Sequence, residues 1–120
     1  MLRLLAVAAS ILLLAGCGAP HELTTQADEV HSLAAEGALL AHEAADGDAF
    51  AAFTTEHCAA LRGRLGELRP AIEDAQLATI AAALDRTLRS LGSHPGDHGR
   101  AAVAERALSR LADRAEELGR

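Results

Sequence analysis

The chain has 120 residues, with 17 acidic residues against 11 Arg and no Lys, and its two aromatic residues are Phe50 and Phe53. The net charge of −6 and the scarcity of aromatic rings argue against nucleic-acid binding, which relies on basic surfaces and on stacking between rings and bases. The length is sufficient for one small domain with a single core.

The N-terminus has the organisation of a bacterial export signal. Arg3 carries a positive charge, and residues 4–14 form an apolar run that only Ser10 interrupts. A transmembrane helix needs about 20 apolar residues, whereas a run of this length is typical of the hydrophobic region of a signal peptide. The residues that follow, Leu14-Ala15-Gly16-Cys17, resemble the lipobox of bacterial lipoproteins.

That resemblance covers the first 17 residues and implies a division of the chain. In lipoproteins the signal peptide is cleaved before the Cys, whose thiol carries a diacylglycerol. Residues 1–16 would then be the signal peptide, 17–21 the lipid-bearing Cys17 and a short tether, and 22–120 a folded domain. Several acyl chains hold a protein firmly to a bilayer. The resemblance therefore predicts attachment through Cys17 to the cell membrane or outer envelope, facing outside the cytoplasm.

The mature part of the chain has the apolar periodicity of helices. A first helix is predicted from about Thr25, with Thr25 and Asp28 as a capping box, to Ala45, and Gly47 is suited to its C-terminal cap. Asp48 is suited to cap a second helix over about 49–68. Its expected apolar face is formed by Phe50, Phe53, Ala60, Leu61, Leu65 and Leu68.

A third helix is predicted to begin at Pro70, because the residue before a proline disfavours the helical conformation. Its apolar face comprises Leu77, Ile80, Leu84, Leu88 and Leu91, and a loop over 92–96 follows. Asp97 is expected to cap a fourth helix, whose apolar face comprises Val103, Ala104, Ala107, Leu108, Leu111, Ala115 and Leu118. The chain is therefore predicted to be all-α, an antiparallel up-down four-helix bundle. The alternative is a three-helix arrangement in which one long helix is kinked at Pro70.

Charge is distributed unevenly along the mature chain. Residues 17–61 contain eight acidic residues and no Arg, whereas residues 62–120 contain nine acidic residues and ten Arg. One interpretation is that the two halves pair with each other, although exposed pairs contribute only about 0–1 kcal/mol each. The other is an acidic surface that attracts cations or a basic partner.

Three histidines in the first two predicted helices are candidate metal ligands: His31, His42 and His57. His31 and His42 fall on one flank of the first helix, but about 16 Å apart along its axis, too far to share an ion. His57 falls on the expected apolar face of the second helix, where a buried imidazole needs a partner. That partner is either a carboxylate or backbone group of a neighbouring helix, or a copper or zinc ion shared with His31 or His42.

After cleavage, Cys58 would be the remaining unmodified cysteine. It is interpreted either as a small buried hydrophobic residue or as a thiol that pairs between chains.

The sequence contains no nucleophile elbow, phosphate-binding glycine loop or dinucleotide fingerprint. His57 and Cys58 are adjacent and would point about 100° apart on a helix, so they cannot act as a nucleophile and its base. The sequence therefore predicts a lipid-anchored module without enzymatic activity or cofactor that acts by binding a partner in the cell envelope. The alternative is a metal-binding lipoprotein of the envelope.

Overall fold

The computed structural model describes the backbone from Leu2 to Arg120 and the side chains of residues 21–120. Four α-helices cover most of the described chain: α1 (Leu2–Ala45), α2 (Ala51–Leu68), α3 (Ala75–Ser93) and α4 (His98–Leu118). A short 3-10 helix, η1 (Arg69–Ala71), lies between α2 and α3. None of the helices, among the residues searched, has an apolar stretch long enough to cross a bilayer.

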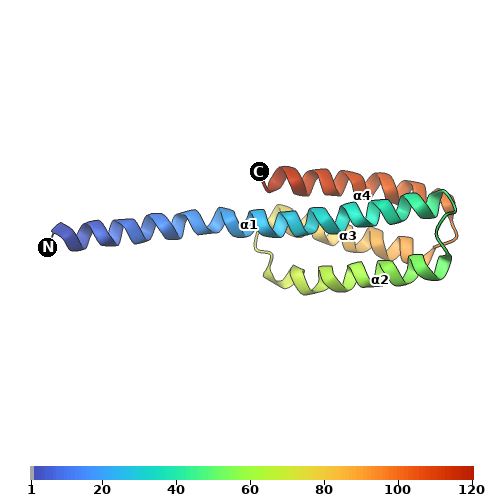
Figure 1. Ribbon diagram of the computed structural model, residues 1–120, viewed down its shortest axis with the longest axis horizontal. Coiled ribbons are helices and arrows are strands. Elements are labelled where there is room, and N and C mark those ends of the chain that lie inside the picture. Colours follow the sequence, from blue (N-terminus) through green and yellow to red (C-terminus); the bar gives the residue numbers. More distant parts are fainter. Residues whose placement is uncertain (1) are drawn as a thin grey trace.

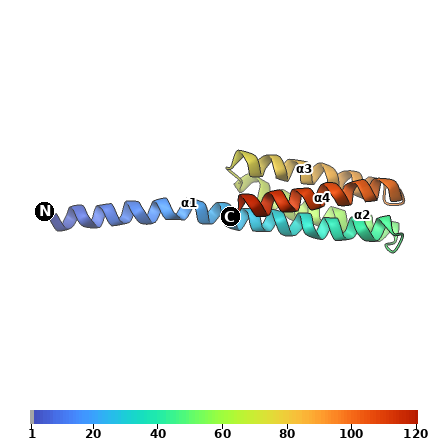
Figure 2. The ribbon, with the colours of Figure 1, turned by 90° about the horizontal axis from the view of Figure 1, so that it is seen from above.

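The helices form an antiparallel up-down four-helix bundle (Figures 1 and 2). Each helix packs against two neighbours, in the order α1, α2, α3, α4 and back to α1. The N-terminal part of α1 extends past the bundle, and the C-terminus lies beside α1 where the bundle begins. We call the opposite end, where the α1–α2 and α3–α4 loops lie together, the distal end.

The core is built from leucine and alanine, and alanines from α1 and α4 allow these two helices to approach closely. The largest completely buried side chains are leucines from all four helices, with Val30, Thr54 and Cys58. Gly37 of α1 contacts leucines of α3 and α4 directly, because it has no side chain. A Cβ added to Gly37 would lie 3.0 Å from the Leu88 side chain and 3.4 Å from the Leu108 side chain.

Local sequence signals explain most helix ends. Gly47 has φ +76° and ends α1, with the amides of Gly47 and Asp48 donating to the carbonyls of Ala44 and Glu43, which is the Schellman motif. Asp97 caps α4 as predicted, because its Oδ1 accepts a hydrogen bond from the Arg100 amide at 3.0 Å.

Two predicted helix starts were wrong. The first helix does not begin at Thr25, because α1 is continuous from Leu2 and the Thr25 hydroxyl donates to the His21 carbonyl within the helix. Asp48 does not cap α2, whose N-cap residue is Phe50 without a side-chain cap.

The junction between α2 and α3 excludes the three-helix alternative but also corrects the predicted start of α3. Pro70 lies in η1, and Ile72 has an extended backbone with ψ 114°, so the chain reverses there. The third helix starts at Ala75 because Asp74 caps it, with Oδ1 accepting from the Leu77 amide at 2.9 Å. Its other end runs through Gly92 to Ser93, so the following loop is shorter than predicted.

Half of the apolar face predicted for α2 was wrong. Leu61 and Leu65 are buried and Leu68 packs against the core as predicted, but Ala60 is exposed, Phe50 is 85% exposed and Phe53 is 49% exposed. Thr54 and Cys58 are buried on this helix instead. Thr54 can be buried because its hydroxyl donates to the Phe50 carbonyl. In α3, by contrast, all five leucine and isoleucine residues predicted to face the core are buried.

Candidate functional site

The three candidate metal ligands have three different partners. His57 Nε2 donates to Glu36 Oε1 of α1 at 3.1 Å, so its partner is a carboxylate of a neighbouring helix, the first of the two interpretations of this residue. Its side chain is partly exposed rather than buried, and its ring packs edge-on against Phe53 with centroids 5.4 Å apart.

Glu36 joins two residues of α2. Its second oxygen, Oε2, accepts from Arg64 Nη1 at 3.1 Å, so one carboxylate bridges His57 and Arg64. The hydrogen bond from His57 is the main reason that the pKa of Glu36 lies below its usual value, and Arg64 adds to the effect. The cluster holds the middle of α1 against α2.

His42 connects α1 to α4. Its Nδ1 donates to Glu105 Oε1 at 2.9 Å, and its Nε2 lies 3.2 Å from Oδ2 of Asp46, four residues further along the chain. The hydrogen bond to Glu105, followed by the negative charges of Glu105 and Asp46, raises the pKa of His42 above 6.5. Both ring nitrogens face carboxylates, so the protonated ring satisfies both.

His31 bonds to the backbone of α4 and not to His57. Its Nδ1 donates to the Ala112 carbonyl of α4 at 2.8 Å.

Within residues 21–120 no group of three or more His, Cys, Asp or Glu side chains is arranged to hold a metal ion. The structure therefore does not bring His31, His42 and His57 together, and Cys17 lies outside the residues whose side chains are described.

The bonds of His42 make the stability of the bundle depend on pH. A raised pKa means that the His42 contribution is complete below about pH 6.5 and is lost as the pH rises through the higher folded-state value. We expect His42→Gln to destabilise the protein at about pH 5.5 and much less at about pH 9, measured by urea unfolding. His94→Gln, which removes an exposed ring bonded to the Ser90 carbonyl, is the control for losing an imidazole alone. An equal effect of His42→Gln at both pH values would contradict this account.

Cys58 is a free thiol inside the core, 1% exposed, in agreement with its interpretation as a small buried hydrophobic residue. An added Cβ on Gly92 of α3 would lie 3.0 Å from Cys58 Cβ, so the two helices meet closely there. Burial raises the pKa of the Cys58 thiol to about 11.

We therefore expect Cys58 to be unreactive in the folded protein, since the thiolate is the reacting form. In Cys17→Ser, alkylation by iodoacetamide at about pH 8 should be at least about 100-fold slower without urea than with it. The same chain with the exposed Val103→Cys shows the rate of an accessible thiol. Rapid alkylation of Cys58 in the folded state, or a Cys58-linked dimer, would show that the thiol is accessible.

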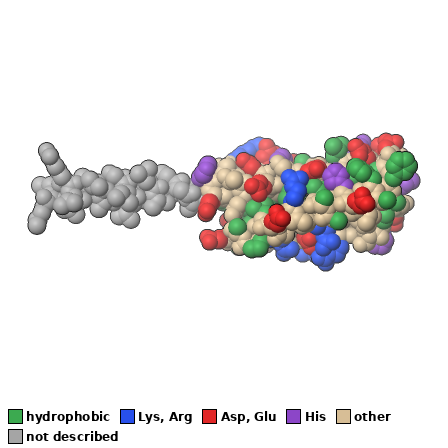
Figure 3. Space-filling model, turned by 60° about the horizontal axis from the view of Figure 1, so that its bottom comes forward, with side chains coloured by type: hydrophobic (Ala, Val, Ile, Leu, Met, Phe, Trp, Pro, Cys, Tyr) green, Lys and Arg blue, Asp and Glu red, His purple; other side chains and the backbone are tan. Residues whose placement is uncertain are grey.

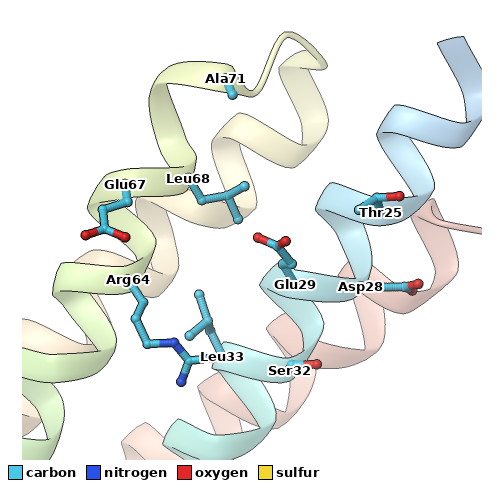
Figure 4. A pocket seen from close by; sticks show the side chains of 9 residues that line it. All are labelled: Thr25, Asp28, Glu29, Ser32, Leu33, Arg64, Glu67, Leu68 and Ala71. Atoms are coloured by element: carbon cyan, nitrogen blue, oxygen red, sulfur yellow. The ribbon is translucent and has the colours of Figure 1, made fainter.

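An open groove of about 710 Å³ lies between α1 and α2 in the half of the bundle away from the distal end (Figure 4). Arg64 and Leu68 extend from α2 toward α1, and Leu33 and Glu29 extend from α1 toward α2, whereas Thr25, Asp28 and Ser32 point away from α2. Its lining combines the apolar Leu33, Leu68 and Ala71 with charged side chains of both signs, among them Arg64 and Glu67.

Exposed hydrophobic side chains gather at the distal end, with acidic side chains beside them (Figure 3). On the α1–α2 side they are Leu39, 60% exposed, with Phe50 and Phe53. Glu36 and His57 are bonded to each other across α1 and α2. Leu39 lies one turn closer to the distal end than Glu36, and Phe53 lies one turn closer to it than His57. We call Leu39, Phe50 and Phe53 the phenylalanine patch. Phe50 and Phe53 were predicted to face the core, because large apolar side chains are usually buried.

The opposite side of the distal end has an apolar groove of about 460 Å³ between α3 and α4. Val103, 57% exposed, Ala104 and Ala107 form its apolar part, and Arg86 and Arg100 are its charged residues. No acidic side chain lines it. We call it the α3–α4 groove; sequence analysis missed it, because Val103 was predicted to be in the core.

The predicted pairing between the acidic first half and the Arg-bearing second half is largely absent. Among residues 21–120, Glu36 is the only acidic residue before Leu61 that forms an ion pair with an Arg. Asp85 instead pairs with Arg62 and Arg89 inside the second half. Most acidic side chains of α1 and of the first turns of α2 are therefore left on the surface.

Comparisons with protein-family models, with curated proteins and with solved structures gave no match to this chain.

Proposed function

We propose that the protein is a lipid-anchored helical module of the bacterial cell envelope, facing outside the cytoplasm, that acts by binding a partner rather than by catalysis. The observation that carries the proposal is Leu14-Ala15-Gly16-Cys17, which resembles a lipobox and follows an apolar run of signal-peptide length. Acylation of Cys17 would supply the stable membrane attachment.

The position of the core supports this division of the chain. The buried side chains of the described residues lie between Ala27 and Ala115, so cleavage before Cys17 would remove none of them. Leu23 is the first apolar side chain packed against the core, which leaves a tether of a few residues after Cys17. With about 24 residues of α1 at 1.5 Å each beyond His21, the distal end would stand roughly 36 Å further from the membrane than the start of the bundle.

The surface supports binding rather than catalysis. The grooves of the described part of the chain are open, His31, His42 and His57 are hydrogen-bonded to groups of neighbouring helices, and the Cys58 thiol is buried. Large exposed hydrophobic side chains are the surface feature that most often marks a protein interface.

The test is the chemistry of the N-terminus. Mass spectrometry of the protein purified from a bacterial host with its membrane fraction should find a mature chain that begins at Cys17 and carries acyl groups. A chain that keeps residues 1–16, or one cut elsewhere with an unmodified Cys17, would refute the proposal.

A further inference from the structure

We propose that the phenylalanine patch of one copy of this chain docks into the α3–α4 groove of a neighbouring copy, so that anchored copies associate side by side. The contact itself depends only on the two surfaces at the distal end. The increase in local concentration that favours it rests on the proposed lipid anchor.

The two surfaces are complementary in shape and polarity. Phe50 is 85% exposed and projects at the N-terminal end of α2, while Val103, Ala104 and Ala107 offer an apolar recess. Removing a phenylalanine side chain of this exposure from water is favourable, by about 25 cal/mol for each Å² of apolar surface buried.

The two surfaces also have opposite charges. Asp48 and Glu56 lie within three residues of Phe50 and Phe53 along the chain; both are exposed, and neither has an ion pair with an Arg among residues 21–120. The α3–α4 groove has Arg86 and Arg100, of which Arg100 pairs with Asp97 and Arg86 has no ion pair within the same residues. Oppositely charged surfaces favour correct docking and disfavour the alternatives.

Two other occupants of the patch are disfavoured, one by charge and one by position. A symmetric dimer through the phenylalanine patch would bring two acidic rims together, because a twofold interface places the same surface on both sides. The bilayer to which the chain would be anchored is also a poor occupant, since the patch lies at the end of the bundle farthest from Cys17.

The position of the two surfaces fits copies that stand in the same direction. The α1–α2 and α3–α4 faces are opposite sides of the bundle, and both surfaces lie at the distal end (Figures 1 and 2). A sideways shift along the membrane therefore places the patch of one copy at the height of the groove of the next. Such a head-to-tail contact does not close on itself and allows short rows. Confinement to a membrane raises the effective concentration, so a small, weak contact suffices.

Cysteine crosslinking between two differently tagged full-length chains tests the contact. Co-produced Ala51→Cys and Ser90→Cys chains, which keep the phenylalanine patch and Val103 intact, should give a crosslinked dimer carrying both tags when treated with a short bismaleimide. Ala51 is exposed and follows Phe50 in the sequence, and Ser90 is exposed in the lining of the α3–α4 groove. Ala51→Cys paired with itself, Ser90→Cys paired with itself, and Ala51→Cys paired with Gln76→Cys should give little. Gln76 is exposed at the other end of α3, so this pair controls for height above the membrane. Chains without an added Cys control for Cys17 and Cys58.

A charge reversal distinguishes docking from random collision. Arg86→Glu with Arg100→Glu in the Ser90→Cys chain should lower the yield of dimer at least about fivefold, and Asp48→Arg with Glu56→Arg in the other chain should restore it. Absence of the Ala51–Ser90 dimer, or equal yields from all pairs, would overturn the proposal. The crosslinked dimer is measured in whichever cell fraction contains the chain. The fraction reports on the lipid anchor and the dimer yield reports on the contact, so the two proposals can fail independently.

Discussion

Cys17→Ala is expected to move the protein out of the membrane fraction almost completely. The substitution removes the thiol that would carry the diacylglycerol, and each buried CH₂ of an acyl chain contributes about 0.8 kcal/mol to membrane binding. The surface of α1 in the bundle is acidic, because residues 21–45 contain five acidic side chains and no Arg. An acidic surface is repelled by the anionic lipids that attract basic segments.

The measurement is fractionation of cells that produce the wild-type chain or Cys17→Ala, followed by a wash of the membranes at high salt. Cys58→Ala is the matched control, since it removes the other cysteine without affecting the lipobox. Membrane association of Cys17→Ala that equals the wild type and resists the salt wash would show that the chain is held by something other than a lipid on Cys17.

Leu108→Ala is expected to destabilise the bundle by about 2–5 kcal/mol, the range for deleting a buried leucine side chain. Leu108 is completely buried in α4 and lies within contact distance of the Cβ position of Gly37 in α1. The cavity would open where α1 and α4 approach most closely, and the core contains no aromatic side chain that could move to fill it. A loss of this size is a large fraction of the 5–15 kcal/mol that stabilises a typical domain.

Urea unfolding followed by far-ultraviolet circular dichroism measures the change, because the chain has no Trp or Tyr for fluorescence. Val103→Ala is the control in the same helix, and since Val103 is exposed its effect should remain within about 0.5 kcal/mol. If the two variants were equally stable, Leu108 would not occupy the core position described here.

The sequence predicted the helices best where the apolar periodicity was strong. The seam of Leu77, Ile80, Leu84, Leu88 and Leu91 is buried as predicted, because five large aliphatic residues at helical spacing leave one orientation that removes them from water. Asp97 and Gly47 were recognised as caps because their effects depend on backbone groups a few residues away. The cap at Asp74 was not predicted, because the conformational restriction before Pro70 indicated an earlier start for this helix.

Prediction failed in α2, where the apolar residues did not define a single face. The two phenylalanines and the leucines fall on overlapping faces of this helix, and periodicity alone could not decide which face turns inward. The neighbours decided it: Gly92 of α3 leaves room for Cys58, and Glu36 of α1 holds His57 and Arg64 at the surface of the α1–α2 interface. Phe50 and Phe53 were then left outside.

The sequence by itself therefore determined the helical class and most of the core, because these follow from local propensity and from the period of the apolar residues. The reversal of the chain at Ile72 decided between four helices and three. The sequence is also the sole source of the prediction that Cys17 is acylated. The tertiary structure alone decided the partners of His31, His42 and His57 and the two exposed surfaces of the distal end. Those features depend on the rotation of each helix against its neighbours, which contacts between residues distant in the sequence determine.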